Sequence, residues 1–262
     1  YRIIDSKFDY SLSPRLGISH PITEKSKLFF NYGHFKQMPV YEELLRISRT
    51  GSGQIANIGD PNLLQAKTVA YELGYDHVIA ENFLLQLAAY YRDISGQQSY
   101  TSILNQRGDV SYRKANNNSY EDVRGAEITI RRNTGRWVRG FVNYTYQVGT
   151  SGFFGLNQIY EDRSEQNLYN RQTGNQYQRK PTPQPYARLV LTFFTPSDFG
   201  PEVGSINIFS DISLNVLGDY KAGEHLTYNP LSAPGIQNNV EVTDYYKLDF
   251  RFSKTFDFDK IK

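Results

Sequence analysis

The side chains of residues 66–93, AKTVAYELGYDHVIAENFLLQLAAYYRD, alternate in character almost without a fault. One face carries Val69, Tyr71, Leu73, Tyr75 and His77, and the other carries Thr68, Ala70, Glu72, Gly74 and Asp76. A period of two is the signature of a strand with one apolar and one wet face. A second alternating run starts at Phe83, so the pattern predicts an antiparallel hairpin over 67–99 with its turn at Ala80–Asn82. Both runs are long, because strands in soluble proteins usually have about 5–6 residues.

The same alternation recurs along the chain and predicts nine strands. They are expected at about 13–20, 27–35, 67–79, 83–99, 120–132, 136–148, 184–195, 204–217 and 243–256. The connections alternate in length, with short ones near 21–25, 80–82, 133–135 and 196–203, and long ones over 36–66, 100–119, 149–183 and 218–242. Outer-membrane β-barrels of bacteria place short turns at one end and long loops at the other. A soluble sandwich has no reason to sort its loops in this way.

The two faces of these strands differ sharply. Apolar side chains predicted to face lipid include Leu87, Leu191, Ile206, Ile208, Leu248 and Phe250. The opposite faces carry full charges, which almost never sit unpaired in a dry core. The interior must therefore be wet or filled by another polar body. This pattern predicts an all-β fold, an antiparallel transmembrane β-barrel, with a soluble β-sandwich or propeller with tyrosine-rich edges as the alternative.

Composition agrees with this fold class. The chain has 262 residues, a net charge of +2, no cysteine and a mean hydropathy of −0.56. A charge this small predicts no nucleic-acid partner, and the lack of cysteine excludes disulfides and thiolate metal sites. Low hydropathy does not exclude a membrane protein, because barrel strands are apolar only at alternate positions. Tyrosine occurs 21 times and clusters near strand ends, where its amphipathic ring suits the membrane interface.

Catalytic and metal-binding motifs are not found. The four histidines, His20, His34, His77 and His225, are scattered and form no H-E-x-x-H motif. We therefore expect no enzyme activity, no cofactor and no metal site.

Two long loops carry the residues that best suit recognition of a solute. Apolar spacing in 37–51 predicts a short helix inside the first loop. Rigid tyrosine rings bury area, and arginine forks around carboxylates. The candidate substrate-binding residues are Tyr41, Arg46, Arg49, Tyr160, Arg163, Tyr169, Arg171 and Tyr177. The alternative is that they are ordinary solvated loop residues.

Six segments, in this order and spacing, together resemble a known family. They are SPRLGISHPI (13–22), LFFNYGHFKQMPVYEELL (28–45), GDPNLLQAKTVAYELGYDH (59–77), LLQLAAYYRDISG (84–96), VRGAEITI (123–130) and DYYKLDFRFSKTF (244–256). The most telling set is Asp60–Leu63, Thr68–Gly74 and Arg124–Glu127. The chain resembles the C-terminal part of the barrel of TonB-dependent outer-membrane receptors.

The resemblance implies a barrel of about 22 strands around a plug domain. Residues 1–262 would be part of that single barrel domain, with the plug and the final strands not in this chain. It also implies import of a ferric siderophore, cobalamin, haem or an oligosaccharide. The partners would be outer-membrane lipid, the solute and, through the plug, the TonB complex. A passive porin or an adhesive outer-membrane barrel is the alternative function.

Overall fold

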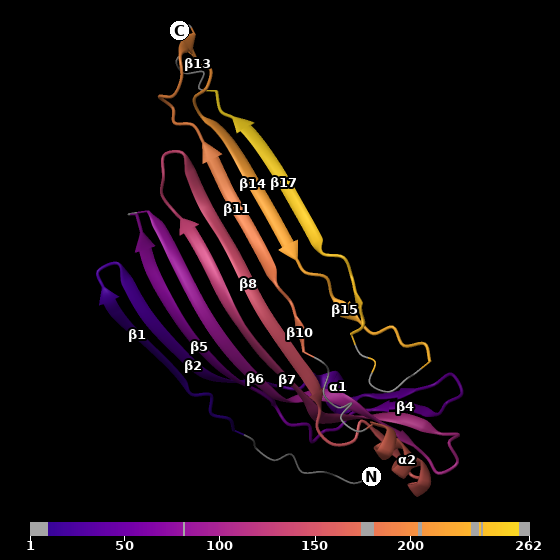
Figure 1. Ribbon diagram of the computed structural model, residues 1–262. Coiled ribbons are helices and arrows are strands. Elements are labelled where there is room, and N and C mark those ends of the chain that lie inside the picture. The colour runs from indigo at the N-terminus through magenta and orange to yellow at the C-terminus, as the bar shows by residue number, and fades with distance from the viewer. Residues whose placement is uncertain are drawn as a thin grey trace.

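The computed structural model describes residues 10–80, 82–173, 181–203, 206–231, 236 and 238–256. One large antiparallel sheet dominates it, and its nine main strands lie side by side (Figure 1). In spatial order they are β1 (Arg15–Thr23), β2 (Ser26–Gln37), β5 (Ala66–Ile79), β6 (Phe83–Leu104), β7 (Ser111–Arg132), β8 (Val138–Phe153), β11 (Tyr186–Phe194), β14 (Ile212–Lys221) and β17 (Tyr245–Lys254). All nine predicted strands exist, and each pairs with its neighbour in sequence order.

Short elements occupy the connections. They are α1 (Tyr41–Leu45), β3 (Ile47–Arg49), β4 (Ile55–Ile58), β9 (Gln158–Tyr160), α2 (Arg163–Thr173), β10 (Thr182–Pro183), β12 (Glu202–Val203), β13 (Ile206–Asn207), β15 (His225–Leu226) and β16 (Val240–Glu241). Figure 1 shows the short turns at the upper end of the sheet and the helix-bearing loops at the lower end. The short helix within 37–51 is confirmed. The predicted sorting of loops by length holds only in part, because the connection over 195–211 at the short-turn end is longer than that over 105–110 at the other end. Within the described residues, no helix has the length and hydropathy that a membrane span requires.

The backbone register carries one apolar face across the whole sheet. Directly paired residues point to the same side, and the pairing connects Leu28–Tyr75–Leu87–Ile128–Tyr144–Ala187–Tyr220–Tyr246 strand by strand. Leu191, Leu248 and Phe250 share this face. Tyrosines gather on it towards the long loops, where the Tyr71 ring lies 5.1 Å from that of Tyr32 and 6.4 Å from that of Tyr91. Such a row of rings suits a membrane interface.

The apolar side chains do not form a hydrophobic core. Among the described residues the only buried hydrophobic side chain is Ala115, while Leu248 is 56% and Phe250 64% exposed. A soluble protein of this size buries many large apolar side chains. An apolar face that stays uncovered over nine strands is what contact with lipid requires.

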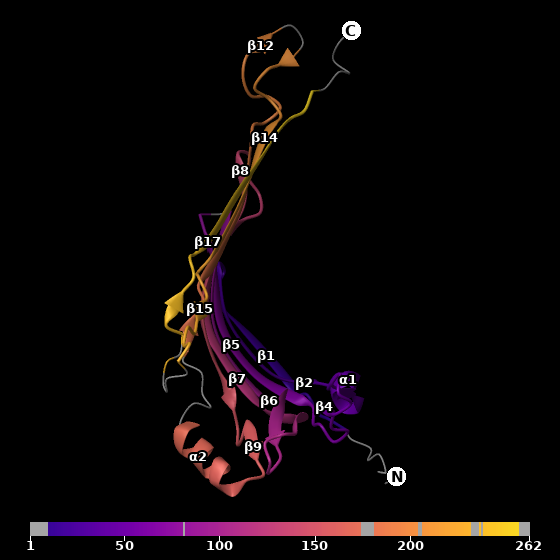
Figure 2. The ribbon, with the colours of Figure 1, turned by 90° about the vertical axis from the view of Figure 1, so that its right-hand side faces the viewer.

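Polar side chains on the opposite face bond to one another across the strands. Asn143 donates to Glu127 Oε1 and to Thr129 Oγ1, each at 2.8 Å, and Arg188 Nε lies 2.8 Å from Asp219 Oδ1. Two hollows of about 670 and 680 Å³ open along this face, both lined by Glu127, Gln147 and Tyr186. Seen nearly edge-on, the sheet is curved (Figure 2). The charged face with its hollows is therefore the lumen side.

The sheet is open. β1 and β17 lie at opposite edges and are not paired with each other in the described chain, as predicted. Nine antiparallel strands with a polar lumen face thus form a piece of wall of a transmembrane β-barrel. The fold class predicted from the sequence is confirmed.

The single strand predicted over 204–217 is wrong in its first part. β14 starts only at Ile212, whereas β13 pairs with β12 in a separate two-stranded sheet. Asp211 has a φ of +51°, a left-handed conformation that ends the extended run. Lys254 Nζ donates to the carbonyl oxygens of Asn207 and Ser210 and fixes this turn. Positions 206 and 208, which the pattern assigned to the lipid-facing side of this strand, therefore precede β14 and are not part of its ladder.

Arginine at Ile128 tests the face assignment. Ile128 is central in the apolar run of β7 between Arg124 and Arg132, so it lies near the middle of the bilayer. We expect Ile128→Arg to destabilise the folded barrel by about 2–4 kcal/mol. Ala88→Arg, opposite Glu127 on the lumen face, should cost much less. Equal losses, measured by denaturant unfolding of the full-length protein in lipid, would contradict the assignment.

Candidate functional site: the outer-loop platform

The β6–β7 hairpin continues far beyond the tyrosine row. Both strands have 22 residues, which at about 3.4 Å per residue exceeds a tilted crossing of the apolar band. A bulge interrupts the register between Ile94 and Ser99, and Gly96 there has a φ of +66°. The predicted loop over 100–119 is therefore wrong, since only 105–110 connects the two strands. The extension lies beyond the tyrosine row, where no strict alternation of apolar and polar side chains is imposed, so the sequence gives no strand signal.

Beyond the bulge the hairpin changes its neighbours. In the wall β6 pairs with β5 and β7 pairs with β8. In the extension β7 pairs in parallel with β4, and β6 pairs in parallel with β9. The order here is β3-β4-β7-β6-β9, so β4 takes the place beside β7 that β8 holds in the wall, and β9 takes the place beside β6 that β5 holds. We call this five-stranded layer, with 99–104 of β6 and 111–116 of β7 at its centre, the outer-loop platform.

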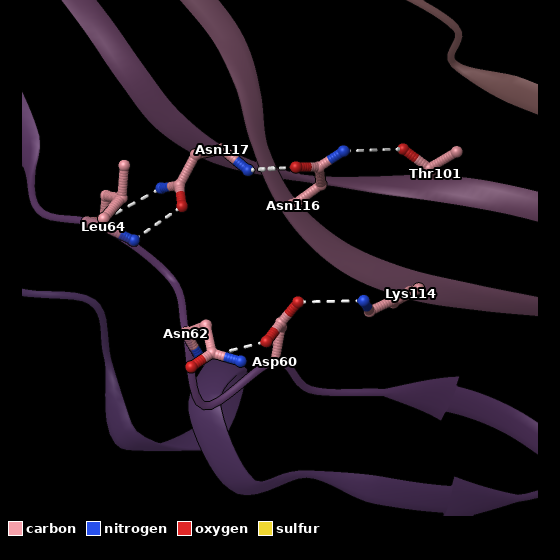
Figure 3. A network of polar contacts seen from close by, with 7 residues as sticks. All are labelled: Asp60, Asn62, Leu64, Thr101, Lys114, Asn116 and Asn117. Carbon is pink, nitrogen blue, oxygen red and sulfur yellow. Dashed lines mark hydrogen bonds and ion pairs between the residues drawn. The ribbon is translucent and has the colours of Figure 1, made fainter. Parts of the chain in front are cut away.

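The loop over 38–65 is tied to the platform by a polar network (Figure 3). The side chain of Asn117 accepts from Leu64 N–H at 2.7 Å and donates to the carbonyl oxygens of Leu64 and Gly96 at 3.0 and 2.8 Å. Lys114 Nζ lies 2.9 Å from Asp60 Oδ2, and Asn62 N–H donates to Asp60 Oδ1. The GDPNL segment thus forms a turn that is fixed to β7.

The same segment packs against α1. A Cβ at Gly59 would lie only 2.6 Å from the carbonyl oxygen of Glu43, so this contact requires glycine. Gly59 N–H donates to Arg46 O, and Asp60 N–H donates to Glu43 O. The backbone of 59–60 therefore satisfies carbonyl groups at the C-terminal end of α1, which otherwise have no intrahelical donor.

Asp60 is ionised and held so by its surroundings. Partial burial alone would raise the pKa of its carboxyl. The hydrogen bond from Asn62 N–H and the ammonium group of Lys114 outweigh that effect and lower the pKa below its usual value. Asp60 therefore both forms an ion pair with Lys114 of β7 and accepts the hydrogen bond that closes the turn at Asn62.

Residues 154–173 meet the platform from the other side. The Gln158 side chain donates to Tyr160 Oη at 2.7 Å, and the Tyr160 and Tyr169 rings lie 5.6 Å apart. Asp162 caps the N-terminus of α2 by accepting from the N–H groups of Ser164 and Glu165. Tyr160 N–H donates to Gln166 Oε1, which holds α2 against β9.

The candidate binding residues fall into two groups at opposite edges of the platform. Tyr41 begins α1 and is 82% exposed, Arg46 pairs with Glu42 at 2.9 Å, and Arg49 of β3 donates to Gly53 O at 3.0 Å. Tyr160 lies in β9, whereas Arg163, Tyr169 and Arg171 lie in α2. Tyr177 lies outside the described residues. β4 and β9 are separated by β7 and β6, or about 14 Å at the usual strand spacing.

Residues between these groups were not singled out from the sequence. Arg113 on β7 donates to Asn57 Oδ1 at 3.0 Å, and its guanidinium lies 5.6 Å from the centre of the Tyr100 ring. A hollow of about 440 Å³ lies beside them, lined by Asp60, Lys114, Ile103, Phe154 and Ile159 among others. It combines a charged pair with apolar walls, which suits a ligand of mixed polarity. No group of three or more His, Asp or Glu side chains suited to a metal occurs among the described residues.

Comparison with known proteins places this wall in a family. The family model described as TonB dependent receptor-like, beta-barrel matches residues 2–261. The chain therefore belongs to the TonB-dependent receptor β-barrel family, as the resemblance in sequence predicted. No curated protein sequence matches it.

Solved structures share the fold at low identity. The outer membrane transporter YddB from Escherichia coli is 14% identical, with a TM-score of 0.57 over 93% of this chain and 33% of that one. The copper transporter OprC is 15% identical, with a TM-score of 0.51 over 91% of this chain and 30% of that one. The chain thus spans about a third of the length of these transporters.

Removal of the Asn117 side chain should release the loop over 38–65. Asn117→Ala loses three hydrogen bonds, so we expect local stability to fall by about 1–3 kcal/mol. In the full-length protein, trypsin should then cut after Arg46 and Arg49 about tenfold faster. Asn105→Ala removes side-chain bonds only within the β6–β7 turn and serves as the control. Equal cleavage in both variants would contradict the anchoring role.

Acid should release the same loop. Because the pKa of Asp60 is lowered on folding, its contribution to stability is complete above the ordinary carboxyl pKa of about 4. That contribution is lost as the pH falls through the lower folded value. Backbone hydrogen exchange at 59–65, corrected for intrinsic rates, should therefore rise below about pH 4. In Asp60→Asn this pH dependence should be absent, and its persistence would exclude Asp60 as the cause.

Proposed function

We propose that the intact protein is an outer-membrane receptor that imports a scarce solute with energy supplied through TonB. The observation that carries the proposal is the lumen face, a curved wall of paired charges such as Arg188–Asp219 and Lys27–Asp76. Such a face fits a hydrated polar body inside the barrel better than an apolar filling. Membership in the TonB-dependent receptor family supports the same function.

In this proposal the described wall is part of one barrel domain of about 22 strands. A plug domain of the intact protein fills the lumen and contacts the charged face. The solute is a ferric siderophore, cobalamin, haem or an oligosaccharide. The low identity to the solved transporters supports no choice among them.

The outer-loop platform is where the proposal places solute capture. Its two edges present tyrosine and arginine from separate loops, and β7 and β6 hold these loops in one layer. Sites on strands hold a binding geometry better than free loops do. Tyr160 is the best-supported binding residue, because Gln158, Gln166 and the Tyr169 ring fix its position.

The energy requirement tests the function. In the source bacterium, we expect uptake of one of the four solute classes to require both the receptor gene and a working TonB. A passive porin would need the receptor but not TonB, and an adhesive barrel would need neither. Tyr160→Ala should raise the solute concentration for half-maximal uptake about tenfold. Tyr228→Ala, an exposed tyrosine in the loop between β14 and β17, is the matched control.

A further inference from the structure

Two lysines meet on the lipid-facing side of the wall, beyond the tyrosine row. The unbroken register of β2 and β5 pairs Lys36 directly with Lys67. The parity is that of Tyr32 and Tyr71, so both lysines project from the apolar face and not into the lumen. Lys36 is exposed and Lys67 partly exposed.

The distance of the two lysines from the tyrosine row sets their position along the membrane normal. Lys36–Lys67 lies four residues beyond the Tyr32–Tyr71 pair. At about 3.4 Å per residue and a tilt of about 40°, that is about 10 Å further along the membrane normal. Tyrosine rows mark the edge of the hydrocarbon, so the two ammonium groups stand at the depth of the lipid headgroups.

No described side chain forms an ion pair with these two lysines. Directly opposed like charges destabilise a sheet, with Cβ atoms about 4.5–5.5 Å apart. Among the described residues neither lysine side chain forms an ion pair or a hydrogen bond. The arrangement therefore gains from any anion that bridges both ammonium groups.

Neighbouring charges limit where such an anion can sit. One strand further along, Asp93 pairs with Val69 of β5 and with Asp122 of β7, on the same face. Asp93 makes no ion pair with Lys67, and these two carboxylates repel an anion from β6 and β7. The positive site is thus confined to β2 and β5.

We propose that Lys36 and Lys67 bind a phosphate group in the headgroup of an outer-leaflet lipid. Basic side chains at headgroup depth bind phosphorylated lipids, and two of them can hold one phosphate between them. The site faces lipid and not the lumen, so it is independent of the solute that the receptor imports. It would fix the rotation and depth of this part of the barrel wall.

Lipid binding to the intact receptor in detergent tests the proposal. Native mass spectrometry with bis-phosphorylated lipid A should give about fivefold weaker binding for Lys36→Gln or Lys67→Gln, and about 25-fold for the double variant. Lys36→Arg with Lys67→Arg should keep the affinity, because the charge remains. Lys25→Gln, an exposed lysine in the short turn at the other end of β2, should change it less than twofold.

Two further binding measurements distinguish a lipid phosphate from free inorganic phosphate as the ligand. Lipid A without phosphates should bind weakly and equally to wild type and double variant. Inorganic phosphate at matched ionic strength should displace no more lipid than chloride does. Unchanged binding in the lysine variants, an equal loss in Lys25→Gln, or displacement by inorganic phosphate would overturn the proposal. Altered mobility of unheated protein on gels identifies misfolded variants, and the two single variants then decide the outcome.

Discussion

The structure depends on one constraint, which is that a backbone inside a bilayer must satisfy every N–H and C=O group within the protein. Continuous antiparallel ladders from β1 to β17 meet this constraint between the edges. The same ladders fix the side-chain parity of each strand relative to its neighbour. One register therefore gives both the uniform apolar face and the uniform charged face, although the described residues form no hydrophobic core that holds the wall together.

The sequence predicts the wall well because lipid and lumen impose a strict period of two. Outside the wall this period of two is not required, and there the prediction from sequence is wrong in two opposite ways. The extension of β6 and β7 is regular structure outside the lipid-facing wall, where no period of two is imposed, so residues 100–104 look like a loop. Ile206, Asn207 and Ile208 alternate by chance, while Asp211 with its positive φ separates them from β14.

The candidate site was predictable in composition but not in arrangement. Tyrosine and arginine in the long loops are visible in the sequence, and their two groups do lie at the outer end. What joins them is contact between distant segments, such as Asn117 with Leu64, 53 residues apart. A local pattern cannot reveal such a pair. The GDPNL segment shows a turn signal in Asp60-Pro61-Asn62. Only the structure shows that this turn contacts Lys114 of β7 and the C-terminal end of α1.

The bulge between Ile94 and Ser99 separates two parts of the hairpin whose side chains have different surroundings. On the wall side of the bulge, each side chain faces either lipid or the lumen, and a charged residue on the lipid face lowers the stability of the barrel by several kcal/mol. On the platform side of the bulge, β4 and β9 add to the edges of the hairpin. The chain thus uses one hairpin first as membrane wall and then as the centre of a loop layer. Because the layer is held by backbone pairing and a few polar anchors, the exposed side chains on it are free to vary without loss of the fold.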